Sequence, residues 1–274
     1  MDPVVLTALS PLDGRYASKV EPLRGYLSES ALIRYRTLVE VRWLQHLANE
    51  ADIQELEPLD SPINDTLNHL VDNFDLEDAR RVKALEAETN HDVKAIEYFL
   101  REKLSAVSSF SPKLGAFLHF ACTSEDINNL SYALMLRDAR QLVLLPGIKA
   151  LTDDLKTLAH EFADIAMLSR THGQPASPTT LGKELANFAH RLLRQSDRFS
   201  TVEIFGKCNG AVGNFNAHVA AYPDAAWIRI SNQFVKSLDL SPTNYTAQIE
   251  SHDWIAEYCH ALIRINTILL DLCR

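Results

Sequence analysis

Apolar residues recur along much of this sequence at alternating steps of three and four positions. That spacing is typical of helices that pack lengthwise against other helices. The clearest runs cover residues 32–47, 148–162 and 181–199, and a run over residues 82–100 predicts a further helix that is weakest around Asn90. No alternating strand pattern competes with them, so the sequence predicts an all-α fold.

The connections between these helices suggest how the chain is divided. Residues 56–62 contain two prolines, and residues 105–112 are rich in serine with one more proline, so each is expected to link helices. Placing a boundary at the second link predicts an N-terminal helical domain over residues 1–110. The start of a long central helical bundle is then expected over residues 111–274.

Both ends of the predicted bundle helices carry signals. The helix over 181–199 is expected to begin with Ser177 as N-cap and Pro178 in the first helical position, where proline loses no hydrogen bond. The last apolar run continues from Ile255 through Leu272 without a Gly or Asn stop signal. We therefore expect the sequence to end within a helix, so that the bundle is truncated on its C-terminal side.

Composition excludes several classes of function. Twenty-seven Lys and Arg against 36 Asp and Glu give a net charge of −9, with no basic run that would follow a nucleic-acid backbone. No apolar stretch reaches the roughly 18 residues of a membrane span, and the N-terminus lacks the pattern of a signal peptide. The four cysteines are far apart, which fits the reducing cytoplasm and predicts neither a disulfide framework nor a metal site. No cofactor motif is found.

Four polar clusters interrupt the helical pattern, and each has a purely structural explanation. D-G-R-Y suits a turn, T-N-H-D-V-K a solvated helix face, T-S-E-D-I-N-N a helix start, and S-R-T-H-G-Q-P-A a loop between two helices. The Gly-rich run over residues 206–214 follows no strand, so it does not fit a dinucleotide-binding fingerprint.

Two of these clusters also suit chemistry. Thr123 and Ser124, which we name the anion seat, join two hydroxyls to the free N–H groups of a helix start, a favourable place for a carboxylate or phosphate. His172 is the best candidate for proton transfer, because imidazole can give or take a proton near neutral pH. A protein of net charge −9 needs such local donors to hold an anion.

Taken in order, these clusters carry a resemblance. T-S-E-D-I-N-N, S-R-T-H-G-Q-P-A and G-A-V-G-N-F-N-A-H resemble the bacterial adenylosuccinate lyases of the fumarase and aspartase superfamily. The likeness extends to S-P-L-D-G-R-Y, T-N-H-D-V-K-A-I-E-Y-F-L and H-F-A-C-T-S-E-D, so it covers nearly the whole sequence. The family implies elimination of fumarate from adenylosuccinate and from the succinylated carboxamide ribotide of purine synthesis.

The resemblance also implies roles for individual residues. It makes His172 the general acid that protonates the departing nitrogen. It assigns the nucleotide and succinyl pocket to residues from several segments, namely Arg15, Tyr16, Asn90, His91, Asp92, Thr123, Ser124 and Gln248.

The sequence departs from the family in one respect. The family's general base is a serine in an S-S-x-M-P-x-K-x-N loop, which is absent here and is expected beyond Arg274. Family members are cytoplasmic homotetramers whose active sites combine residues of three subunits. These residues alone are therefore expected to be inactive.

Two other readings stay open at this point. Another superfamily lyase, such as an argininosuccinate lyase, would share the chemistry, although D-G-R-Y and T-N-H-D-V-K favour the purine branch. A non-catalytic helical oligomerisation module would need only the apolar seams. The presence of His91, His172 and the anion seat in one chain argues against it.

Overall fold

The computed structural model describes residues 7–274, and their contacts divide the chain into two compact units. The first unit holds the described residues up to Arg137 together with Ile204–Ser251, and the second holds Asp138–Glu203 together with His252–Arg274. Helices dominate both units, which confirms the predicted all-α class. The boundary expected at residue 110 lies inside the first unit.

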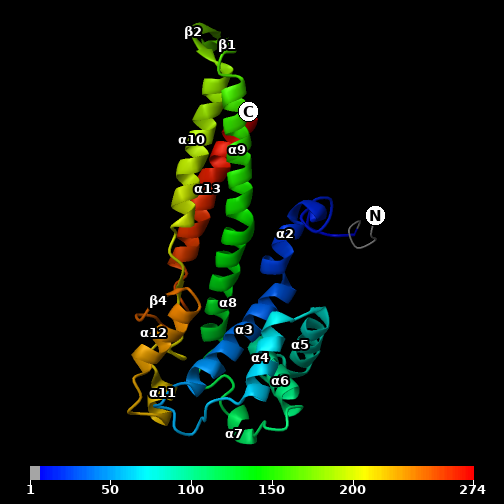
Figure 1. Cartoon of the computed structure of the whole chain (residues 1–274), viewed down its shortest axis with the longest axis vertical. Helices are drawn as coiled ribbons and strands as arrows, with labels where there is room; N and C mark the ends of the chain where they lie inside the picture. Colours follow the sequence, from blue (N-terminus) through cyan, green and yellow to red (C-terminus); the bar gives the residue numbers. More distant parts are fainter. Residues whose placement is uncertain (1–6) are drawn as a thin grey trace. The chain divides into compact units, whose positions relative to one another are not determined.

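The first unit is assembled around α3 (Glu29–Ala48), which packs against the preceding helix and against three helices that follow it in the sequence (Figure 1). The three that follow are α4 (Ser61–Asp72), α5 (Leu76–Thr89) and α6 (Asp92–Ser105). The remaining elements are α2 (Ala17–Leu27), α7 (Pro112–Gly115), α8 (Ser124–Ala139, shared with the second unit at its end), α11 (Asn216–Ala221), α12 (Trp227–Ser237) and the parallel strand pair β3 (Phe205–Gly206) and β4 (Ser241–Pro242).

The apolar face predicted over residues 32–47 forms the core of this unit. Val39, Trp43 and Leu47 on α3 are fully buried. The Trp43 ring packs against Phe234 of α12 with 4.9 Å between centroids, and its indole N–H donates to the Phe120 carbonyl at 3.0 Å. Burial of this face excludes large apolar areas from water, which is the main driving force for folding.

The helix predicted over residues 82–100 is in fact two helices, α5 and α6. Asn90 ends α5 in the left-handed conformation, with φ 51°, and its N–H donates to the Glu86 carbonyl at 2.8 Å. His91 then begins α6 as its N-cap. Asparagine tolerates left-handed backbone better than most residues, which explains a break that the apolar spacing alone did not show.

The second unit contains three long helices, α9 (Leu145–Glu161), α10 (Leu181–Ser200) and α13 (Asp253–Cys273), preceded by the π-helical η1 (Arg140–Leu144). Helix α10 packs against both α9 and α13, as Figure 1 shows. The rings of Phe199 and Tyr258 meet edge to face at 4.8 Å, and Leu192 and Ile265 are buried. The predicted seams of α10 and α13 therefore face one another, whereas Leu151 and Leu158 of the predicted seam on α9 are exposed. No helix within residues 7–274 has both the length and the apolar character needed to cross a membrane.

The polar segment between α9 and α10 is a β-hairpin, where a loop was expected. Strand β1 (Ala166–Thr171) pairs antiparallel with β2 (Gln174–Thr180). Ser177 and Pro178 lie in β2, so the predicted helix start is wrong: α10 begins at Leu181, where the Thr180 hydroxyl accepts the Lys183 N–H at 3.2 Å. Each strand of an isolated pair is an edge strand, and an edge tolerates proline.

Candidate functional site

The anion seat lies at the start of α8, as predicted. Helix α8 begins at Ser124, and the N–H of Asp126 donates to the Thr123 carbonyl at 2.9 Å. In return, Oδ2 of Asp126 accepts the Thr123 N–H at 2.8 Å. Gln248, from a segment more than a hundred residues further along, donates to the Thr123 hydroxyl at 3.3 Å. Thr123 and Gln248, two predicted site residues from distant segments, are therefore in contact.

His91 reaches the same seat from α6. Its Nδ1 accepts the backbone N–H of Lys94 at 3.0 Å, so a neutral imidazole carries its proton on Nε2. That Nε2 lies 3.4 Å from Oγ of Ser124, and the ring N–H is therefore placed to donate to the hydroxyl. A hydroxyl that accepts in this way keeps its own proton for a bound anion.

Asp92 and Asn90 flank His91, and the three residues line one hollow of about 550 Å³ together with Lys83, Glu86 and Ala87. The carboxylate of Asp92 accepts from Nη2 of the buried Arg36 at 2.5 Å. Nε of Arg36 donates to the Asn128 side chain of α8 at 2.8 Å. Asp92 thus fixes the start of α6 relative to α8, which holds His91 near Ser124.

Arg15 and Tyr16 lie at the start of α2, and both side chains are exposed. The guanidinium of Arg15 stands 5.0 Å from the centre of the Tyr16 ring, a cation–π contact. Arg15 and Tyr16 take no part in the hydrogen bonds that join His91 to Ser124 and Gln248 to Thr123.

His172 occupies the tip of the hairpin in the second unit. His172 and Gly173 form the two-residue turn between β1 and β2, with φ 51° and 75°. Two consecutive positive φ angles are the mark of a type I′ turn, which favours glycine at its second position. The turn leaves the imidazole exposed, so it is accessible for proton transfer.

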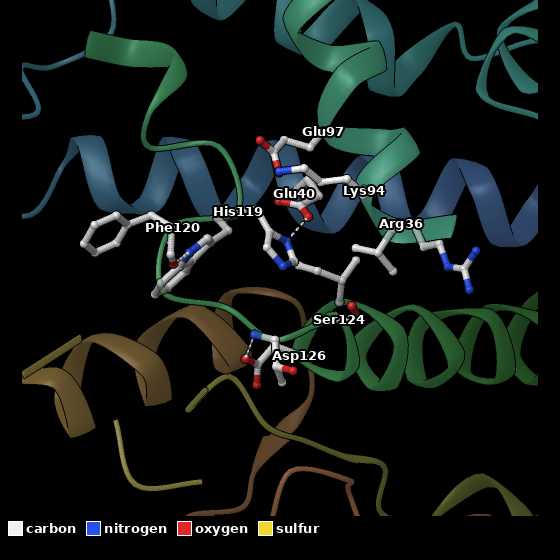
Figure 2. A network of polar contacts seen from close by, with 12 residues as sticks. Arg36, Glu40, Lys94, Glu97, His119, Phe120, Ser124 and Asp126 are labelled. Carbon is white, nitrogen blue, oxygen red and sulfur yellow. Dashed lines mark hydrogen bonds and ion pairs between the residues drawn. The ribbon is translucent and has the colours of Figure 1, made fainter. Parts of the chain in front are cut away.

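The first unit also contains a contact between His119 and Glu40 that was not predicted from the sequence (Figure 2). Nδ1 of His119 lies 2.6 Å from the completely buried carboxylate of Glu40 on α3. Burial lowers the pKa of the His119 imidazole, but the charge and hydrogen bond of Glu40 outweigh it, and the pKa is raised. A glutamate between Val39 and Val41 on an apolar helix face was the signal that the sequence offered.

Backbone strain marks the same turn. His119 and Ala121 both have left-handed backbone, with φ 57° and 58°. Such conformations cost free energy in non-glycine residues and are common at functional sites. Among the described residues, no group of three or more His, Cys, Asp or Glu side chains is placed to hold a metal ion.

Known proteins resemble this chain over nearly its whole length. The model of a family described as "Lyase" matches residues 14–274. The adenylosuccinate lyase of Haemophilus influenzae is 54% identical over 269 residues, which are 98% of this chain and 59% of that protein. That of Escherichia coli K12 is 54% identical over 272 residues, again 98% of this chain and 59% of the relative. The sequence resemblance is confirmed, although the chain spans only about three fifths of these relatives.

Solved structures share the fold at low sequence identity. A fumarate lyase from Mesorhizobium sp. BNC1 matches 92% of this chain and 55% of its own, with a TM-score of 0.71 and 19% identity. A β-carboxy-cis,cis-muconate cycloisomerase from Acinetobacter calcoaceticus matches 92% of this chain and 56% of its own, with a TM-score of 0.71 and 20% identity. These likenesses establish the fold.

Proposed function

The chain belongs to the lyase family, and we propose that it carries the substrate-binding and proton-donating part of an adenylosuccinate lyase. The reaction would release fumarate from adenylosuccinate to give AMP, and from succinylaminoimidazole carboxamide ribotide to give AICAR. The observation that carries the proposal is the 54% identity to adenylosuccinate lyases over 98% of the chain.

The chemistry needs a proton at the leaving nitrogen. When the proton on the carbon next to a carboxylate is removed, the electron pair forms the double bond of fumarate and the neighbouring carbon–nitrogen bond breaks. The departing nitrogen then takes a proton, and His172 is proposed as its donor. Imidazole suits this role because it remains partly protonated at a pH where a carboxylic acid has ionised.

The first unit is proposed to hold the charged groups of the substrate. The hydroxyls of Thr123 and Ser124, with the imidazole of His91 behind Ser124, offer donors for a carboxylate or phosphate. The hollow beside His91 is within the size range of small-molecule sites. Arg15 and Tyr16 would add a cation and a phenol, and Asn90, Asp92 and Gln248 would complete the pocket. No cofactor or metal is assigned a role.

The partners follow from the same proposal. The substrate is an anionic nucleotide, and the assembly is a cytoplasmic homotetramer with active sites shared between subunits. The net charge of the chain is −9. Even so, the second unit exposes several large apolar side chains, and these support the proposal. They are Leu142, Leu151, Leu158, Leu193, Ile263 and Leu270. Exposed apolar area on long helices is typical of surfaces that pack against other subunits. Nucleic acid and membrane are not proposed as partners.

Kinetics on the complete enzyme test this function. We expect turnover of adenylosuccinate, followed by fumarate release, and at least about 10³-fold lower kcat/KM with argininosuccinate, because a site built for one set of polar groups rejects a substrate that leaves them unpaired. Equal activity with both substrates, or activity with argininosuccinate alone, would contradict the assignment to the purine branch.

The anion seat makes a separate prediction for Ser124→Ala. A hydrogen bond to a charged group contributes roughly 1.5–3 kcal/mol, so loss of this hydroxyl should weaken substrate binding about tenfold or more. We expect the fold to survive, because the start of α8 retains the exchange of hydrogen bonds between Thr123 and Asp126. Calorimetric titration with AMP and with fumarate, beside a melting curve, measures both effects. Unchanged affinity for both ligands with a lowered melting temperature would show that Thr123 and Ser124 serve only to cap α8.

A further inference from the structure

Asp126 and Lys207 form an ion pair beneath the anion seat, and neither side chain is exposed. Nζ of Lys207 lies 3.0 Å from Oδ1 of Asp126, and it also donates to the Gly210 carbonyl at 3.1 Å. Buried charges are costly to remove from water, so a pair at complete burial needs strong compensation. Here each partner supplies the opposite charge.

The Asp126 carboxylate is also surrounded by backbone donors. It accepts the N–H of Thr123 at 2.8 Å, of Asn209 at 3.0 Å and of Gly210 at 3.1 Å. Gly210 has φ 85°, a left-handed backbone that glycine adopts freely. The Gly-rich run over residues 206–214 therefore binds an anion, but that anion is the protein's own carboxylate.

Asn129 fixes the lysine to the same helix. Its side-chain oxygen accepts the Lys207 N–H at 2.9 Å, and its amide donates to the Lys207 carbonyl at 3.0 Å. Gly206, just before, approaches α8 so closely that an added Cβ would lie 2.5 Å from a methyl of Leu130. The loop is held against the first turns of α8 on two sides.

A third segment is joined to the loop through Asn209. The side-chain amide of Asn209 donates to the Thr246 hydroxyl at 2.8 Å, and the N–H of Glu250 donates to Glu125 of α8 at 3.3 Å. Gln248, which donates to Thr123, lies between these two links. The position of Gln248 thus depends on the loop that Lys207 holds.

The electrostatic consequence concerns any anion at the seat. Asp126 bonds directly to the Thr123 backbone, so its negative charge lies one hydrogen bond from the seat. Without a counter-charge it would repel a carboxylate or phosphate, and burial would leave that repulsion poorly screened. Lys207 cancels the charge from inside the protein, where salt does not reach it.

We infer that Lys207 is a positioning residue of the anion seat: it neutralises Asp126 and holds the loop over residues 206–214 against α8, so that Thr123 and Ser124 accept an anionic group. The inference rests on the proposed function and deepens it. Lys207 itself need not touch the substrate.

The two halves of the pair give different predictions for substrate binding. In the complete enzyme, Lys207→Met leaves an unpaired negative charge beside the seat and should raise KM for adenylosuccinate on the order of tenfold or more, with a much smaller change in kcat. Asp126→Asn leaves an unpaired positive charge and should not raise KM by more than about threefold. Both single variants should melt at lower temperature, because each leaves a buried charge alone.

The neutral double variant Asp126→Asn/Lys207→Met is the matched control. It should recover a KM close to that of the wild type and part of the lost melting temperature, since no unpaired charge remains although the Asn209 N–H loses its carboxylate acceptor. A merely structural pair would make both single variants raise KM alike, and that result would overturn the inference, as would an unchanged KM in a folded Lys207→Met enzyme. A wild-type enzyme without adenylosuccinate turnover would overturn the proposed function, and this inference with it.

Discussion

Replacing His172 by alanine is expected to lower kcat for adenylosuccinate in the complete enzyme by at least about 10²-fold, the usual contribution of a general acid. KM should change much less, because the proposed substrate contacts of the first unit remain. The hairpin should still form, since Gly173 keeps its positive φ and alanine is only mildly strained in the first turn position.

His160→Ala is the matched control for this prediction. His160 is an exposed histidine of α9 in the same unit, outside the hairpin. We expect its replacement to leave kcat within about twofold, as for most surface substitutions. Rapid-mixing kinetics of fumarate release would measure both variants. A His172→Ala enzyme with near-normal kcat would show that His172 is not the proton donor. His119 would then be the next imidazole to test.

The apolar seams were predictable because each long helix buries one face. Residues 32–47 and 181–199 keep the three-four step throughout, and the structure places both inside helices, with Val39, Trp43 and Leu47 of the first and Leu192 and Phe199 of the second fully buried. The start of α8 was also predictable, since Thr, Ser and acidic residues at a helix start satisfy free N–H groups locally. Such features depend on neighbours in the sequence.

The hairpin that carries His172 had no comparable signal. No residue of β1 or β2 is buried, so neither strand has a buried face and no apolar alternation arises. Its two prolines, Pro175 and Pro178, favoured a loop followed by a helix start. The hairpin is defined by backbone pairing, with Thr171 opposite Gln174, and this pairing does not depend on the apolar pattern of the side chains.

The buried polar pairs could not be predicted from the sequence for a different reason. Glu40 and His119 are 79 positions apart, and the side chains of Asp126 and Lys207 come from segments separated by more than eighty residues. Lysine and glutamate are usually exposed, so a solvated position was the reasonable expectation for each. Only the packing of α3, α8 and the Gly-rich run brings the opposite charges together.

Another histidine of the first unit, His218, is surrounded by aromatic rings. His218 is completely buried, and in the part of the chain that the structure describes neither ring nitrogen has a hydrogen-bond partner. Its ring packs edge-on against Trp227 at 4.8 Å and Phe215 at 5.4 Å. Burial lowers the pKa of His218 to about 4, with Asp126 opposing the shift and Lys207 adding to it. At neutral pH the ring is therefore an uncharged aromatic group within an aromatic cluster.

Acid should destabilise the protein through His218. Its pKa is about 4 in the folded state and 6.5 in the unfolded chain, so the unfolded chain binds more protons between those pH values. The free energy of unfolding must therefore fall as the pH is lowered through this window, by about 3 kcal/mol in full. His218→Phe keeps an aromatic ring and removes the titration, so its unfolding free energy should fall less over the same range. Urea unfolding of both proteins at pH 7 and pH 4.5 measures the difference, in which the titrating groups that do not interact with His218 cancel. If the two proteins lose the same stability between these pH values, His218 is hydrogen-bonded or hydrated in solution and does not sense acid.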